Sequence, residues 1–296
     1  MNTYGENFKK MMKCQNIDIG LIRNKQTPQG FYPLPNELKI DFSEALAKNN
    51  IFRRLSTVVS MDSPEGTLYV TNSNCIADWN DNSKVVQDDD ISKFDIKSHK
   101  LTGICRLDED FVYDTKFDIE SYLINTFAKR FGKSEENAFL NGNGIDIPTG
   151  LLNYEGAVTG VSALSDKLSY DDIVKLYFSL DAEFRENAVF IMHDDTAMFL
   201  RTIKDSDGYP IFNSNNNTIF GKPVETSCFM PKLTTGVKAI LFGDFSYHWI
   251  IERQPFAVKC LNELYAEEDL IGYLGNERLD SKIINSDAIK VLSIGE

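Results

Sequence analysis

One long stretch with a helical repeat, residues 118–140, constrains this chain more than any other feature of its sequence. Its bulky apolar side chains recur every four positions and therefore share one face of an α-helix: Ile119, Leu123, Phe127 and Phe131. Asp118 can cap the first turn, and Asn141-Gly142-Asn143-Gly144 is typical of a helix end. The pattern predicts the longest helix of the chain, over about residues 118–141. Gly132 allows a kink in its middle.

The other periodic segments mix helices with strands and do not alternate strictly. Helices are predicted over residues 36–49 and 169–187, and a third is predicted to be capped by Asp194 or Asp195. Strands are predicted over residues 55–61, 67–70, 94–100, 103–107, 189–192, 238–242, 247–251, 257–261 and 288–294. This mixture indicates an α+β fold rather than a doubly wound parallel sheet.

Two segments offer little apolar material for a core. Residues 1–30 are polar and irregular, which is typical of an arm rather than a domain. Residues 72–95 are also polar, with Asp88-Asp89-Asp90 in the middle, and strand signals flank them. That arrangement fits an extended hairpin-like loop that protrudes from the subunit, and it equally fits a disordered insertion.

Charge and cysteine content narrow the class of function. The formal net charge is -13, whereas a protein that grips phosphates normally has a basic surplus. The five cysteines form no CxxC pair, so we expect free thiols in a reducing compartment rather than a zinc site. No apolar run approaches the length of a membrane-spanning helix, and residues 1–15 do not resemble a signal peptide.

A search for reactive groups assigns no catalytic, cofactor-binding or metal-binding residue. The chain has three histidines, His99, His193 and His248, and none belongs to a spaced ligand cluster. His193-Asp194-Asp195 is best interpreted as a helix start, and the Asp88–Asp90 run as a solvated loop rather than a calcium site. The segment Asn141–Gly144 is neither a P-loop nor a dinucleotide fingerprint, and no GxSxG motif occurs. The residues by themselves therefore indicate an acidic α+β protein without a visible active site.

Several short motifs occur in an order that is characteristic of one family. They are Gly30-Phe31-Tyr32-Pro33-Leu34-Pro35, the segment 114–123, Glu135–Gly144 followed by Pro148-Thr149-Gly150-Leu151-Leu152, Phe220-Gly221-Lys222-Pro223-Val224, Phe242-Gly243-Asp244-Phe245-Ser246, and Glu277-Arg278-Leu279 with Asp287-Ala288-Ile289. In this order they resemble the major capsid proteins of tailed bacteriophages with the Hong Kong 97-type fold. The resemblance covers about residues 30–294.

The resemblance implies an architecture and a role. It implies an N-terminal arm and first helix in residues 1–50, and a peripheral domain in residues 51–150 with an extended loop near 69–97 and a spine helix near 118–141. It also implies an axial domain in residues 151–255 and a return to the peripheral domain in residues 256–296. Copies would self-assemble into pentamers and hexamers of an icosahedral shell around double-stranded DNA, in the host bacterial cytoplasm. A scaffolding protein, a maturation protease and a portal would be partners, DNA would be contacted without sequence specificity, and no membrane would be involved.

The chain departs from the family pattern at several places. Many relatives begin with a helical scaffolding segment that a protease removes, whereas this sequence begins almost at the arm. Some relatives crosslink neighbouring subunits with the help of a glutamate, but Asn276 stands where that carboxylate is expected, so the crosslink is not carried over. Asn143 also replaces the aspartate of the family's usual Gly-Asp-Gly loop.

Three alternative functions remain at this point. An encapsulin-type nanocompartment shell would have the same fold and would enclose a cargo enzyme instead of DNA. An enzyme with a dispersed active site and a monomeric interaction module are the other two. The sequence offers no constellation of reactive residues for the enzyme, and a fold alone would not support it.

Overall fold

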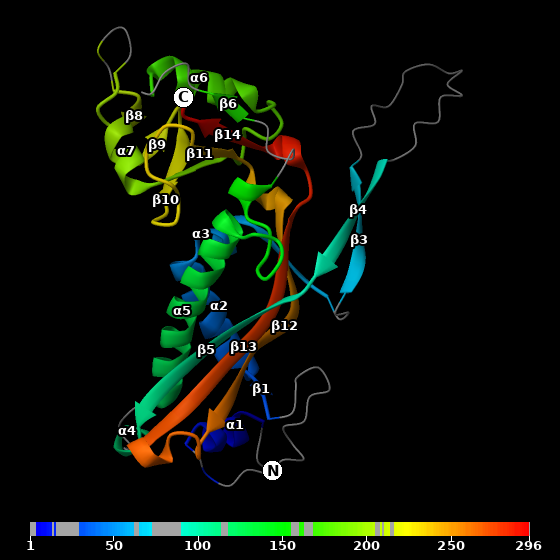
Figure 1. Cartoon of the computed structure of the whole chain (residues 1–296), viewed down its shortest axis with the longest axis vertical. Coiled ribbons are helices and arrows are strands. Elements are labelled where there is room, and N and C mark those ends of the chain that lie inside the picture. Colours follow the sequence, from blue (N-terminus) through cyan, green and yellow to red (C-terminus); the bar gives the residue numbers. More distant parts are fainter. Residues whose placement is uncertain are drawn as a thin grey trace.

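Two long antiparallel strands, β12 (His248–Leu261) and β13 (Leu270–Ile283), run along the axis of the computed structural model (Figure 1). A five-stranded sheet is built around them in the order β1-β12-β13-β5, and β2 pairs in parallel with β12 beside β1. The N-terminus lies near one end of this axis and the C-terminus near the other (Figure 1). The structure describes residues 4–13, 15, 30–61, 65–72, 90–113, 118–154, 160–162, 168–204, 208, 210–213 and 216–295.

The elements follow one another in a mixed order, so the α+β class is confirmed. The helices are α1 (Tyr4–Met12), α2 (Asn36–Asn49), α3 (Ile51–Leu55), α4 (Glu109–Tyr113), α5 (Ile119–Asn141), α6 (Tyr170–Ser179) and α7 (Asp194–Leu200), with short 3-10 helices η2 (Leu151–Asn153), η3 (Phe245–Tyr247), η4 (Ala266–Glu268) and η5 (Ser286–Ala288). The remaining strands are β1 (Tyr32–Pro33), β2 (Thr57–Ser60), β3 (Glu65–Asn72), β4 (Asp90–Lys97), β5 (His99–Asp108), β6 (Gly160–Ser162), β7 (Val189–Met192), β8 (Phe212–Asn213), β9 (Thr218–Ile219), β10 (Lys222–Thr226), β11 (Lys238–Gly243) and β14 (Ile289–Ser293).

A second sheet, of seven strands, forms the other end of the molecule. Its order is β6-β14-β11-β7-β10-β9-β8. Strand β7 is buried at every position, which explains its uninterrupted apolar sequence. Side chains from α6, α7 and this sheet make one hydrophobic core, and α5 with the five-stranded sheet makes another. A third core, with residues from α3, α5, β7, β11 and β13, joins the two ends.

Helix α5 is the longest helix among the described residues, as the sequence predicts. Asp118 caps it, because its carboxylate accepts hydrogen bonds from the Ser121 amide at 3.2 Å and the Ser121 hydroxyl at 2.7 Å. The apolar stripe is buried against the five-stranded sheet, and Phe127 and Phe131 both pack on Phe256 of β12. This packing fixes the helix across the sheet (Figure 1).

Gly132 allows α2 to approach α5 closely. The helix is continuous through this position, so the glycine does not end it. A Cβ atom at residue 132 would lie 3.1 Å from Cβ and 3.2 Å from the carbonyl oxygen of Asn49, at the end of α2. The glycine is therefore needed for the contact between the two helices.

Several predicted boundaries are wrong. Residues 4–12 are helical rather than irregular, because Phe8, Met11 and Met12 of α1 are buried in the core beneath α5. Helix α6 ends at Ser179 instead of near 187, and the Arg185 side chain donates to the freed Leu180 carbonyl at 2.6 Å. The strands predicted at 247–251 and 257–261 are one bulged strand, β12.

The predicted extended loop is only partly described. Strands β3 and β4 form an antiparallel hairpin that begins at Glu65, four residues before the predicted start of the loop, and residues 73–89 lie outside the described residues. The acidic run falls largely in that gap, since only Asp90 is described, at the start of β4.

None of the helices in the described part of the chain is long and apolar enough to cross a membrane.

We predict that Gly132→Leu destabilises the subunit through the contact between α2 and α5. The added side chain must displace Asn49 backbone, so the free energy of unfolding should fall by about 1–3 kcal/mol despite the better helix propensity of leucine. Urea unfolding followed by circular dichroism measures this. Ser134→Leu, at an exposed position of the same helix, is the matched control and should change the free energy by less than about 0.5 kcal/mol. Equal losses in the two variants would contradict the close approach.

Candidate functional site

The β3–β4 hairpin is the part of the described chain that projects from the body (Figure 1). Its two strands pair with each other and form a sheet of their own. Tyr69 is 66% exposed and Ile91 is 60% exposed, and they share one face with Lys93. Leu68 and Phe94 pair on the opposite face and are only partly buried. A two-stranded ribbon cannot bury either face by itself, so both are available to another surface.

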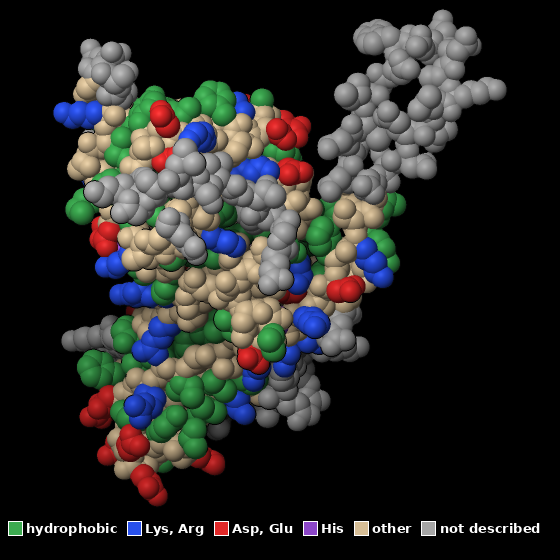
Figure 2. Space-filling model, turned by 45° about the horizontal axis from the view of Figure 1, so that its top comes forward, with side chains coloured by type: hydrophobic (Ala, Val, Ile, Leu, Met, Phe, Trp, Pro, Cys, Tyr) green, Lys and Arg blue, Asp and Glu red, His purple; other side chains and the backbone are tan. Residues whose placement is uncertain are grey.

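The base of the hairpin is anchored firmly to β13. Ile96 is buried there, and the Lys97 amide donates to the Asp280 carboxylate at 2.9 Å. Asp280 is fully buried, and Lys282 Nζ lies 3.4 Å from it. The hairpin therefore leaves the sheet from a fixed point, and hydrophobic and basic side chains lie side by side on its described part (Figure 2).

A buried charge cluster lies where α3 and α5 meet the five-stranded sheet. The Arg53 guanidinium donates two hydrogen bonds to Glu135, at 2.8 Å from Nε and 2.5 Å from Nη2, and a third to Glu252. The side chains of Arg53 and Glu135 are 7% and 0% exposed. Asn50 caps α3 through its side-chain oxygen and donates from Nδ2 to Glu135 at 2.9 Å. The geometry is the fork-to-carboxylate arrangement that only arginine can provide.

The next residue of α5 holds the same short helix. Glu136 accepts a hydrogen bond from the Ile51 amide at 3.1 Å, and its other oxygen accepts one from the Ser227 hydroxyl at 2.5 Å. Consecutive glutamates of α5 therefore bind the first turn of α3, and Glu136 also binds the segment after β10. No local sequence pattern predicts this role of Glu136.

Glu277 adds a third carboxylate to the cluster. It is 4% exposed, and its Oε1 atom has no hydrogen-bond partner among the residues that the structure describes. Burial, reinforced by the negative charge of Glu135 and opposed by Arg53, raises the pKa of Glu277 well above its usual range. Glu277 is therefore protonated more readily than an exposed glutamate and can stay neutral beside the paired carboxylates.

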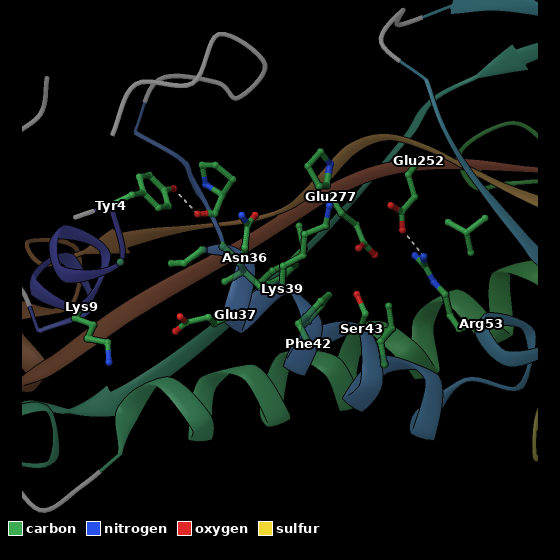
Figure 3. Close-up of a pocket in the computed structure, with 18 of the residues that line it drawn as sticks. Tyr4, Lys9, Asn36, Glu37, Lys39, Phe42, Ser43, Arg53, Glu252 and Glu277 are labelled. Carbon is green, nitrogen blue, oxygen red and sulfur yellow. Dashed lines mark hydrogen bonds and ion pairs between the residues drawn. The ribbon is translucent and has the colours of Figure 1, made fainter. Parts of the chain in front are cut away.

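The cluster borders a groove of about 1140 Å³ between α1, α2 and β12. Figure 3 shows Arg53 and Glu252 at one end, Tyr4 and Lys9 at the other, and Glu277 pointing into the space between them. Tyr4 donates a hydrogen bond to the Pro33 carbonyl, which ties α1 to β1. The groove walls combine apolar residues, with Phe42, Leu46 and Phe256 among them, and charged residues such as Lys39 and Glu37.

The histidines that the sequence analysis considered are dispersed and structural. His99 Nε2 lies 4.0 Å from Asp280 at the hairpin base. His193, and not Asp194 or Asp195, caps α7, because its Nδ1 accepts from the Asp195 amide at 3.0 Å; the predicted cap was wrong by one or two residues. His248 is buried against Phe52 and Phe139, and burial lowers its pKa to about 3. Within the described ranges no group of three or more His, Cys, Asp or Glu side chains is placed to hold a metal ion.

We predict that Arg53→Leu costs about 3–5 kcal/mol of unfolding free energy, because it leaves the Glu135 carboxylate buried without its partner. Arg54→Leu is the matched control. Arg54 is the next residue, is 45% exposed and pairs with Glu225 at 2.9 Å, so its loss should cost no more than about 1 kcal/mol. Chemical denaturation of both variants measures the difference. Similar losses would show that the buried pair contributes no more to stability than the exposed pair.

We predict that Glu277→Gln protects the protein against the loss of stability that wild type shows as pH rises above the ordinary carboxyl pKa. The pKa of Glu277 is raised in the folded state, so the stability that its neutral form contributes is complete below the ordinary carboxyl pKa and is lost as pH rises through the raised pKa. The loss is at most about 1.4 kcal/mol per pH unit between the ordinary carboxyl pKa and the raised pKa, and it levels off above the raised pKa. Thermal unfolding across a pH series should show wild type and Glu277→Gln converging below the ordinary carboxyl pKa and separating as pH rises above it. Glu37→Gln, an exposed glutamate of the same groove, should follow wild type; a constant offset for Glu277→Gln would refute the shift.

Comparison with known proteins places the chain in one family. The model of the phage capsid family matches residues 30–294. No curated protein matches the chain. The structure is similar to the capsid of an empty GTA particle, with 25% sequence identity, a TM-score of 0.69, and coverage of 94% of this chain and 97% of that one.

Less similar sequences share the fold. A structure from Microbacterium phage Oxtober96 has 16% identity and a TM-score of 0.59, with 83% of this chain and 91% of that chain covered. A virus-like particle from Pyrococcus furiosus has 12% identity and a TM-score of 0.60, with coverage of 87% and 98%.

Proposed function

The chain belongs to the phage capsid family and is a major capsid protein, and we propose that its copies assemble into pentamers and hexamers of a closed icosahedral shell around double-stranded DNA. The projecting β3–β4 hairpin carries this proposal. Tyr69 and Ile91 are exposed on an element that cannot bury them within its own subunit, and its base is fixed by Asp280. Packing on a neighbouring copy would bury these exposed apolar side chains.

The charge of the chain supports a non-specific relation to the packaged DNA. A formal net charge of -13 per copy disfavours tight binding to phosphates, so the shell would enclose DNA without gripping it. We further propose a scaffolding protein, a maturation protease and a portal as partners, assembly in the cytoplasm of a bacterial host, and no catalytic activity of the chain itself. These proposals rest on family membership.

The two sheets suggest how the domains divide. We propose that the five-stranded sheet with α5 and the hairpin forms the peripheral domain, and that the seven-stranded sheet with α6 and α7 forms the axial domain. Strand β14 pairs with β11 and β6, so under this proposal residues 289–293 go with the axial domain rather than with the return segment 256–296.

An encapsulin-type shell is the second candidate, because the structure also resembles the virus-like particle from Pyrococcus furiosus. At 12% identity this likeness concerns the fold alone. The match of the phage capsid family over residues 30–294 supports the first candidate. Shells isolated from the producing cell distinguish the two by their contents: a packaged genome supports the phage capsid, and a single cargo enzyme supports the nanocompartment.

We predict that the double variant Tyr69→Thr/Ile91→Thr folds normally and fails to assemble. Both side chains are exposed, so the unfolding free energy should change by less than about 1 kcal/mol, whereas the protein concentration needed for shells should rise by about tenfold or more. Sedimentation and electron microscopy of the purified protein measure the shell fraction. Met198→Thr is the control, since Met198 is 65% exposed on α7. Normal shells from the double variant would contradict the proposed role of the hairpin.

A further inference from the structure

The loop that follows α5 contains two Asn-Gly pairs in very different environments. Asn141-Gly142 ends the helix, and Asn143-Gly144 lies two residues further on. An Asn-Gly pair is the sequence in which a backbone nitrogen meets least steric hindrance when it approaches the preceding side-chain amide, because glycine has no Cβ atom. The function proposed above uses neither pair.

The first pair is held in place. The Gly142 amide donates to the Ala138 carbonyl at 2.9 Å, and Asn141 Nδ2 donates to the Phe229 carbonyl at 2.9 Å and to Asn137 at 3.0 Å. Gly142 is buried, and a Cβ atom there would lie 1.8 Å from the Pro148 carbonyl oxygen. Its nitrogen is engaged in the last helical turn and cannot move toward the Asn141 side chain.

In the second pair Asn143 is exposed, Gly144 is half-buried, and the Asn143 side-chain amide is activated. Asn143 Oδ1 accepts hydrogen bonds from three successive backbone amides, at 3.0 Å from Ile145, 3.2 Å from Asp146 and 3.5 Å from Ile147. These donors withdraw electron density from the amide carbonyl and stabilise negative charge that develops on its oxygen, as an oxyanion hole does. Asn143 and the neighbouring Ile145 are exposed, the latter at 79%, so water reaches the loop.

The loop also requires glycine at position 144. Its φ is +72°, and a Cβ atom would lie 2.5 Å from Thr149 Oγ1. The fold therefore keeps an unhindered nitrogen next to an activated amide, and the isolated antiparallel bridge between Asn143 and Thr149 has to open for the attack.

We propose that Asn143 is a site of spontaneous deamidation in the folded protein. The Gly144 nitrogen attacks Cγ of Asn143 and loses its proton, the side-chain nitrogen takes up a proton and leaves as ammonia, and a succinimide ring remains. Water then opens the ring. Addition at Cγ breaks the Cγ–N bond and gives aspartate, whereas addition at the backbone carbonyl breaks the other C–N bond and gives isoaspartate. Each conversion adds one negative charge to the subunit.

The same three amides favour one product. They face the Cγ oxygen, so they activate that carbonyl of the ring toward water, and the carboxylate that results at this position accepts all three hydrogen bonds. The folded protein should therefore give a larger share of aspartate than the denatured chain.

The test is mass spectrometry of peptides from the full chain after incubation in mildly alkaline buffer. In folded protein Asn143 should convert at least about tenfold faster than Asn141, the internal control, and in denatured protein the two should convert at similar rates. Incubation in ¹⁸O-water should place the label in the new carboxyl group. Equal rates at the two sites in the folded protein, or no conversion of Asn143 while the denatured chain converts, would overturn the proposal.

Two variants complete the experiment. Asn143→Gln should stay unmodified, because its cyclisation needs a larger ring. Asn143→Asp should unfold at the same temperature as wild type or above it, because the loop already offers three donors to a carboxylate. A lower unfolding temperature, or an aspartate share equal to that of the denatured chain, would overturn the role given to the three amides.

Discussion

The bidentate ion pair between Arg53 and Glu135 is the interaction around which the elements of this subunit are arranged. A guanidinium that is almost completely removed from water needs hydrogen-bond acceptors, and here Arg53 donates three hydrogen bonds to carboxylates of α5 and β12. Glu277 brings β13 to the same point. Such buried clusters add little net stability, because desolvation offsets the attraction. Their effect is geometric, since the hydrogen bonds of Arg53 and Glu135 form only in one relative placement of α3, α5 and β12.

That placement determines what remains outside the body. With α5 fixed across the five-stranded sheet, β13 is covered along most of its length, and its Asp280 is left where the hairpin departs. The apolar residues of the body are divided among three cores that follow one another along the molecule. Tyr69 and Ile91 belong to none of them. The two long strands β12 and β13 give the subunit its length, and the buried Asp280 fixes the base of the hairpin to β13.

Local patterns predicted much of the secondary structure and little of the site. Helices α2 and α5 and strand β7 follow from their periodicity and length. Strand β13 was missed, because Gly272, Gly275, Asn276 and Glu277 interrupt its apolar residues and it is buried on both faces. The charge cluster joins residues as far apart as Arg53 and Glu252, and no local pattern reports such a pairing.

One signal for the cluster was nevertheless present. Glu135 comes four residues after Phe131 and so continues the buried stripe of α5, where a carboxylate must have a partner. Helix α1 was missed for a related reason. Its buried face is short, and the helix is stabilised by packing on the core that it shares with α5. The sequence can show that a buried partner is needed, but the identity of that partner depends on tertiary structure.

The position of β12, β13 and β14 in the two sheets has a consequence for synthesis. Strands β12 and β13 separate β5 from β1 and β2, and β14 connects β6 to β11 in the other sheet. All three come from the last fifty residues of the chain, so neither sheet can close while the ribosome is still translating residues before 248. The hairpin at residues 65–97 emerges much earlier than its anchor, Asp280. A nascent chain therefore cannot present an anchored hairpin to its neighbours until synthesis has passed residue 280.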